Sequence, residues 1–205
     1  MSSKDNILKA IRNQFVESVP LPSLDQDWID YEDRVAHFAE TLESVGGAAH
    51  VVQSMEQVQE ILSQVPQYAD AKKCVSTVSG ISANVDLNTI GDPHELEDID
   101  FAVLQGQFAV AENGAVWITD RDVKHRVIYF IPQYLAFVVH CPGDAASAIV
   151  SNMYQAYEQI KLTGEAEFGA FISGPSKTAD IEQSLVIGAH GARSLHVFLV
   201  ENQTP

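Results

Sequence analysis

The densest group of chemically useful residues lies at positions 172–182, near the C-terminal end of the chain. Small, hydroxyl and charged residues follow one another there, in the order Ile172-Ser173-Gly174-Pro175-Ser176-Lys177-Thr178-Ala179-Asp180-Ile181-Glu182. The pattern predicts a strand, a turn and then a helix with an acidic first turn. Free backbone amides beside Lys177 favour an anion at this point. The structural alternative is that Ser176 or Thr178 only caps the helix and Gly174-Pro175 only turns the chain.

A second group surrounds His190 in the segment Val186-Ile187-Gly188-Ala189-His190-Gly191-Ala192-Arg193. Glycines on both sides of the histidine let the backbone come close to a ligand. His190 can donate a hydrogen bond or carry a proton near neutral pH, and Arg193 adds a cation. The alternative is a glycine-rich connection with a solvated histidine. His196, which follows, is expected to be a packed, hydrogen-bonded histidine rather than a ligand.

The third group is centred on Glu112, in Ala109-Val110-Ala111-Glu112-Asn113-Gly114-Ala115-Val116. Asn113-Gly114 between two apolar runs predicts a tight hairpin turn. A carboxylate at the rim of a sheet can act as a base, a nucleophile or a ligand anchor, so Glu112 is the single catalytic candidate. The alternative is a structural glutamate beside the turn.

Two further segments carry polar residues in loops. Residues 77–81 can cradle an anion after a strand, and a local basic cluster is formed by Arg121, Lys124, His125 and Arg126. A solvated loop is the simpler interpretation of the basic cluster. No nucleophile elbow, dinucleotide fingerprint or Walker loop is present. Cys74 and Cys141 lie inside apolar runs without a Cys-x-x-Cys spacing, so we expect buried thiols, no cofactor and no metal site.

The charge of the chain excludes one class of partner. Twenty-eight acidic and 12 basic residues give a net charge of −16, which opposes binding to nucleic acid or to an anionic membrane surface. Residues 1–100 hold 18 acids and 6 bases, whereas residues 101–205 hold 10 and 6, so an anion is expected in the second half. No run approaches the roughly 20 apolar residues of a membrane span and the N-terminus lacks a leader pattern, so we expect a cytoplasmic protein.

The elements that must position these groups follow from periodicity and turn residues. Ser2 and Asp5 form a capping pair for a helix to about Glu17, and prolines at 20 and 22 end it, so residues 1–22 are expected to form a helical arm and residues 23–205 one domain. The arm is a candidate for self-association or partner contacts. Further helices are expected at 31–45, 54–65, 144–161 and 179–185, and strands at 48–52, 74–78, 100–104, 108–111, 115–119, 135–140, 168–172 and 195–200. This alternation predicts an α/β fold with a largely parallel central sheet flanked by helices, and a hairpin at 108–119 inserted in or added to that sheet.

These motifs together resemble the lactate-utilisation (LUD-domain) family, and in particular its C-type proteins. The resemblance rests on Ser173 to Glu182, on Leu185 to Gly191 with Leu195-His196-Val197, and on Phe108 to Ala115; it covers roughly residues 35–200. It implies a fold like that of ribose-5-phosphate isomerase, glucosamine-6-phosphate deaminase and CoA-transferases. The ligand-binding residues that it indicates are Ser173, Gly174, Pro175, Ser176, Lys177, Thr178, Asp180, His190 and Gly191.

The resemblance also implies a role in oxidising L-lactate to pyruvate. The chain would be the cluster-free accessory subunit, binding a small anion or partner subunits that carry iron–sulfur clusters. A different function remains open: a stand-alone isomerase or acyl-CoA-transferase-like enzyme acting on a phosphorylated or CoA-linked small molecule, with Glu112 as base or nucleophile.

Overall fold

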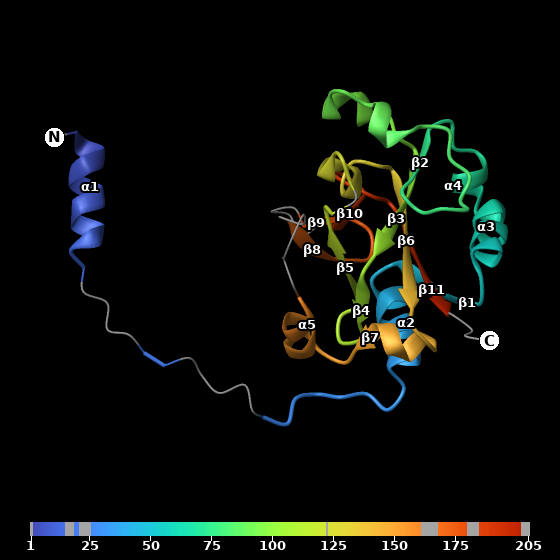
Figure 1. The fold of residues 1–205 in the computed structure, drawn as a ribbon, viewed down its shortest axis with the longest axis horizontal. Coiled ribbons are helices and arrows are strands. Elements are labelled where there is room, and N and C mark those ends of the chain that lie inside the picture. Colours follow the sequence, from blue (N-terminus) through green and yellow to red (C-terminus); the bar gives the residue numbers. More distant parts are fainter. Residues whose placement is uncertain are drawn as a thin grey trace.

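The protein contains two large sheets that pack face to face and a smaller two-stranded sheet (Figure 1). The computed structural model describes residues 2–14, 19–20, 26–121, 123–160, 168–179 and 185–201. The first sheet has the order β1-β11-β6-β3-β2, and all its neighbouring strands run parallel. These strands are β1 (Gly47–Val52), β2 (Cys74–Ser76), β3 (Phe101–Gly106), β6 (Tyr134–Cys141) and β11 (Leu195–Glu201). The predicted α/β fold with a parallel central sheet is confirmed.

The second sheet contains the predicted hairpin, which is therefore not part of the parallel sheet. Its order is β7-β4-β5-β8, and its strands are β4 (Phe108–Val110), β5 (Ala115–Thr119), β7 (Ile149–Val150) and β8 (Gly169–Ser173). The chain changes sheets at Gly106, where an added Cβ would lie 2.5 Å from Val116 and 2.9 Å from Val139. A side chain does not fit there, because the two sheets meet at this residue.

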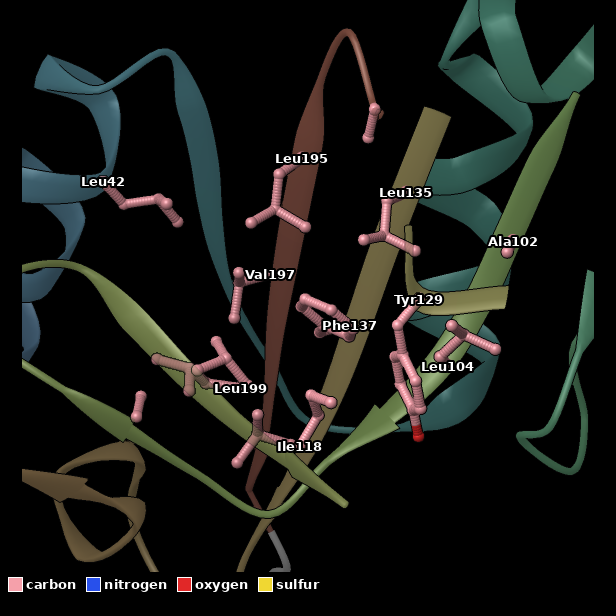
Figure 2. Packing of buried hydrophobic residues seen from close by; sticks show 14 of the residues in the cluster. Leu42, Ala102, Leu104, Ile118, Tyr129, Leu135, Phe137, Leu195, Val197 and Leu199 are labelled. Carbon is pink, nitrogen blue, oxygen red and sulfur yellow. The ribbon is translucent and has the colours of Figure 1, made fainter. Parts of the chain in front are cut away.

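The main core lies between the two sheets (Figure 2). Leu135, Phe137, Val197 and Leu199 of the parallel sheet are almost fully buried and face Ile118 of the second sheet. The side of this layer is closed by α2 (Arg34–Ser44), through the buried Phe38 and Leu42. Burial on this scale is the main stabilising term in the fold.

Helices cover the outer faces of both sheets. On the parallel sheet, α3 (Met55–Gln64) buries Val58 and Leu62, and the short α4 (Pro66–Ala69) follows it. On the second sheet, α5 (Met153–Gln159) lies over Phe108 and Trp117. The layers are therefore helix, parallel sheet, mixed sheet and helix.

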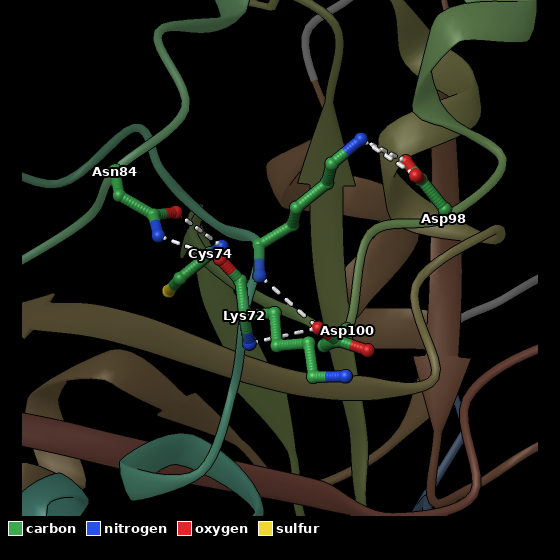
Figure 3. A network of polar contacts seen from close by, with 6 residues as sticks. Lys72, Cys74, Asn84, Asp98 and Asp100 are labelled. Atoms are coloured by element: carbon green, nitrogen blue, oxygen red, sulfur yellow. Dashed lines mark hydrogen bonds and ion pairs between the residues drawn. The ribbon is translucent and has the colours of Figure 1, made fainter.

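A polar network fixes the start of the short edge strand β2 (Figure 3). The side chain of Asn84 accepts a hydrogen bond from the amide of Cys74 at 2.8 Å and donates one to the carbonyl of Lys72 at 2.7 Å. The carboxylate of Asp100 accepts from the amides of Lys72 and Lys73 at 2.9 and 3.0 Å. These bonds of Asp100 connect the residues just before β2 to the residue just before β3.

The capping pair predicted from Ser2 and Asp5 is confirmed. Ser2 and Asp5 form a capping box at α1 (Ser3–Arg12), and Ser54 caps α3 by accepting from the amide of Gln57. None of the residues of α1 is buried, and Figure 1 shows α1 apart from the two sheets. The helix ends at Arg12, with Asn13 as its C-cap, which is earlier than the expected end at about Glu17; residues 15–18 lie outside the described residues.

The prediction of one long helix at 144–161 is wrong. The chain forms a 3-10 turn, η4 (Ala145–Ala148), then β7, and only then α5, which Asn152 caps by accepting from the amide of Gln155. Ile149 and Val150 pair with Ala109 and Val110, because pairing in the second sheet outweighs helical periodicity.

The prediction of a helix at 179–185 is contradicted at both of its ends. Ala179 and Leu185 lie in β9 (Lys177–Ala179) and β10 (Leu185–Ile187), which pair with each other as antiparallel strands. Residues 180–184 lie outside the described residues.

Three further 3-10 turns are η1 (Leu87–Thr89), η2 (Pro93–Leu96) and η3 (Arg126–Tyr129). None of the helices described here is long and apolar enough to cross a membrane.

Candidate functional site

Six of the nine predicted ligand residues line one cavity, called here the Ser173 pocket. They come from two segments, the loop after β8 and the loop before β11. The cavity has a volume of about 270 Å³ and is lined by Tyr129, Phe130, Leu135, Phe171, Ile172, Ser173, Gly174, Pro175, Ser176, His190, Gly191 and Ala192.

Hydrogen bonds hold the two loops of the pocket together. The amide of Ser176 donates to the carbonyl of Ala192 at 2.7 Å, and the amide of Gly188 donates to the carbonyl of Ser176 at 2.8 Å. The hydroxyl of Ser173 donates to the carbonyl of Asn113 at 2.6 Å, which joins the hairpin turn to the same loop. The pocket is therefore a preorganised arrangement of three segments that are distant in sequence.

Two glycines are required where the pocket backbone makes close approaches. Gly174 has a φ of +67°, and a Cβ there would lie 3.0 Å from the carbonyl oxygen of Val45. A Cβ on Gly191 would lie 3.0 Å from the Cβ of Ser176 and 3.2 Å from the carbonyl oxygen of Phe130. Side chains at these positions would strain the loops or push them apart.

The walls of the Ser173 pocket determine what it can bind. Phe130, Phe171 and Leu135 form an apolar side, while Ser173, Ser176 and His190 supply polar groups. The pocket lies at the carboxyl end of β8 and at the amino ends of β6 and β11. It suits a small molecule with one polar end, held by hydroxyl groups and the imidazole of His190.

The remaining predicted ligand residues are not in the lining. Lys177 and Thr178 are exposed residues of β9, and Asp180 lies outside the described residues. Arg193 is exposed; its amide donates to the carbonyl of Gln133 at 2.7 Å. The lining therefore contains no lysine or arginine. Ligand contacts by Lys177, Thr178 and Asp180 remain predictions.

The described contacts of Glu112 are structural. Its carboxylate accepts a hydrogen bond from the amide of Met153 at 2.9 Å, at the first residue of α5. Its own amide donates to the carbonyl of Ser151 at 3.0 Å. A carboxylate at a helix N-terminus stabilises the free amides there. Catalysis by Glu112 remains a prediction.

The basic cluster is resolved into separate roles. Lys124 donates to the carbonyl of Asn88 at 2.8 Å, and the Nε2 of His125 lies 3.0 Å from the carbonyl oxygen of Ile90. Arg126 pairs with Asp120 at 3.5 Å and lies over the ring of Phe168. Arg121 lines a cavity.

That cavity, called here the Arg121 cavity, was not identified from the sequence. Its volume is about 340 Å³ and its lining is Gln107, Phe108, Trp117, Thr119, Arg121, His140, Pro142, Ser147, Ala148 and Gln159. A smaller void of about 20 Å³ beside it is lined by Thr77, from the loop at 77–81, among others. The sequence does contain a signal for this cavity, because Gln107 and His140 are polar residues at the ends of apolar strands.

The two cysteines are buried, and two histidines pair with each other on adjacent strands. Cys74 and Cys141 are free and buried, as predicted, and burial raises the pKa of each thiol to about 11. His50 and His196 are partly buried on adjacent strands, with Nε2 and Nδ1 3.1 Å apart. Among the described residues, no three histidine, cysteine or acidic side chains are grouped as metal ligands.

Comparison with known proteins assigns the chain to a family. A family model described as the LUD domain matches residues 91–200, more than half of the chain. This span contains both cavities and the hairpin turn.

Curated relatives agree with this match. A lactate utilization protein C of Shouchella clausii is 33% identical over 113 residues, which cover 53% of this chain and 47% of that protein. Another, from Geobacillus kaustophilus, is 36% identical over 101 residues, 46% of this chain and 40% of that protein. The lactate utilization protein C 1 of Bacillus mycoides is 32% identical over 126 residues, 56% and 50% of the two chains. The matches thus span about half the length of the relatives.

A solved structure has a similar fold. The crystal structure of a DUF162 family protein from Deinococcus radiodurans superposes with a TM-score of 0.51 at 16% identity, covering 82% of this chain and 96% of that one. At this identity the likeness concerns the fold alone. On the family match over residues 91–200, the chain belongs to the LUD-domain family.

Proposed function

We propose that this protein is an accessory component of a cytoplasmic system that oxidises L-lactate to pyruvate. The observation that carries the proposal is its 30–37% identity to several proteins named lactate utilization protein C. In this role the protein contributes ligand binding or subunit contacts, and partner subunits with iron–sulfur clusters carry the electrons.

The chemistry of the cysteines supports this division of labour. An iron–sulfur cluster is held by thiolates. Cys74 and Cys141 lie in separate strands, β2 and β6, and the raised pKa of both thiols opposes thiolate formation. These two residues are therefore poor candidates for holding a cluster.

The Ser173 pocket is the proposed ligand site within this function. Its hydroxyl groups and His190 can hydrogen-bond the carboxylate and hydroxyl of a small organic acid, and its phenylalanines can contact the carbon chain. Lys177, at the rim of the same loop, adds long-range attraction for an anion. Because Glu112 is engaged at the start of α5, the geometry favours this binding role over an enzyme that uses Glu112 as base or nucleophile.

The test is lactate-dependent dye reduction by the reconstituted system with and without this protein. We expect activity to fall in its absence and to return when the wild-type chain is added. A Ser176→Ala/His190→Ala chain should restore less activity than wild type, whereas the exposed His94→Ala control should restore it fully. Unchanged dye reduction without the chain would refute the accessory role. Full activity with the double variant would refute only the role of the pocket.

A further inference from the structure

The Arg121 cavity and the Ser173 pocket lie at opposite ends of the strands of the parallel sheet. Gln107 directly follows β3, and His140 is the penultimate residue of β6, so the cavity opens at the carboxyl ends of these two neighbouring strands. The Ser173 pocket is instead at the amino ends of β6 and β11, and the two cavities share no lining residue. Ligands of open parallel sheets bind outside the carboxyl ends of the strands.

The lining of the Arg121 cavity favours an anion. It contains one arginine and no aspartate or glutamate, although the chain has 28 acidic residues. Arg121 forms no hydrogen bond or ion pair with any described residue. Among the described acidic residues near the cavity, Asp120 pairs with Arg126 and Asp144 caps η4. An anion would be the counter-ion that the structure does not otherwise give to Arg121.

Neutral polar groups and an apolar wall complete the cavity. The side chains of Gln107, His140 and Gln159 likewise have no hydrogen-bond partner in the described part of the chain, so they are available to a ligand. Phe108 and Trp117, a cross-strand pair with 8% of each residue exposed, form the wall. Amides, an imidazole and one guanidinium beside aromatic rings match a molecule with a polar end and an apolar body.

We propose that the Arg121 cavity binds a small organic carboxylate, with the carboxylate on Arg121 and the carbon skeleton against Trp117. A monocarboxylate matches the single positive charge of the lining, whereas a phosphate group favours several cations. The fork of the guanidinium can bind both oxygens of a carboxylate. This proposal does not rest on the function assigned to the Ser173 pocket.

Trp117 provides a direct reporter of binding. The chain has two tryptophans, and the other, Trp28, stacks on Tyr154 at a centroid distance of 3.4 Å. In a Trp28→Phe background, which retains an aromatic ring on Tyr154, the emission comes from Trp117 alone. The probes are benzoate and L-lactate, two carboxylates that differ in their apolar bodies, and benzamide, which has the shape of benzoate without its charge.

We expect saturable quenching or shifting of Trp117 emission by a carboxylate, with benzamide at least about tenfold weaker than benzoate. Arg121→Gln should weaken carboxylate binding at least about tenfold, and Arg121→Lys should be intermediate. Lys124→Gln is the matched control, because Lys124 belongs to the same basic cluster but bonds to Asn88 outside the cavity. It should leave the affinity unchanged.

Three results would overturn the proposal. The first is the absence of a saturable response to both carboxylates at tens of millimolar. The second is equal weakening by Arg121→Gln and Lys124→Gln, which would indicate general electrostatic attraction. The third is equal affinity for benzamide and benzoate. Arg121 is exposed, so its variants should keep the wild-type melting temperature. A variant of Ser176 should leave the response of Trp117 to a carboxylate unchanged, which would show that the response does not come from the Ser173 pocket.

Discussion

The pair formed by His50 and His196 is predicted to make the fold sensitive to mild acid. The two residues lie on the adjacent parallel strands β1 and β11, with Nε2 of His50 3.1 Å from Nδ1 of His196. One ring must donate this hydrogen bond and the other must accept it, so the accepting ring is neutral at the facing nitrogen. The ring of Phe198 stacks on His50 at 4.8 Å and helps to shield the pair. Protonation of the accepting ring would place two N–H groups against each other.

The magnitude follows from the pKa of His196. Burial, followed by the charge of His50 when protonated, lowers the pKa of His196 from its ordinary 6.5 to about 4. Burial also lowers the pKa of His50. Between about pH 6.5 and pH 4, His196 is therefore protonated in the unfolded chain but mostly neutral in the folded chain. Because the unfolded state binds more protons, the free energy of unfolding falls as the pH falls through this window. From pH 7 to pH 5 the loss from His196 would be about 2 kcal/mol if the ring were fully shielded, and about 1 kcal/mol after allowance for its partial exposure.

Urea unfolding at pH 7 and pH 5 measures this effect. His196→Gln retains a side chain that can hydrogen-bond to His50 but does not titrate. We expect the wild type to lose about 1 kcal/mol more unfolding free energy between the two pH values than this variant. The control is His94→Gln. His94 is exposed and its pKa is raised by the hydrogen bond to Asp92, so this residue favours the folded state at low pH and its replacement cannot reduce the acid sensitivity. An equal loss of stability in the wild type and in His196→Gln would refute the reasoning.

Three further predictions concern packing and thiol reactivity. Gly114→Ala should lower the unfolding free energy by about 2 kcal/mol or more, because φ is +65° and the new Cβ would lie 2.9 Å from the amide nitrogen of Leu42; a loss below 0.5 kcal/mol in urea unfolding would contradict this. Phe137→Ala should cost about 3–5 kcal/mol in the same measurement, since the ring is fully buried between the two sheets, and near-wild-type stability would show that this core is not close-packed. Cys74 and Cys141 should react with a thiol reagent at pH 8 much more slowly in the folded than in the urea-unfolded protein, because burial raises the pKa of both; fast labelling of the native chain would disprove their burial.

Much of the fold could be predicted from local patterns. Uniformly apolar runs such as the one at 135–140 correctly indicated strands covered on both faces, and Ser2, Ser54 and the Asn113-Gly114 turn marked element boundaries. These signals are local, because caps and turns depend on hydrogen bonds between residues two to four apart.

The errors arose where pairing with distant strands decides the structure. Ile149 and Val150 follow a helical pattern in sequence but pair with the strand at 108–110. The hairpin at 108–119 has the residue pattern expected of a strand pair in any sheet. Its place in the second sheet follows from the change of sheets at Gly106, which lies in close contact with both sheets.

The candidate sites differ in how far sequence could reveal them. Ser173 and His190 were identified from adjacent residues and from family resemblance, and the fold brings their loops together through the bond between Ser176 and Ala192. The Arg121 cavity combines residues of two sheets, a 3-10 turn and α5. Sequence could not single out Arg121, because it belongs to a basic cluster whose other members, Lys124, His125 and Arg126, bond to groups of the protein outside the cavity.

The proposed role in L-lactate oxidation is tested most directly by the consumption of L-lactate in cells from which this chain has been deleted. We expect the deletion strain to grow normally on glucose, to stop consuming L-lactate, and to recover when the wild-type chain is supplied in trans. Unaltered L-lactate consumption in the deletion strain would contradict the proposed function.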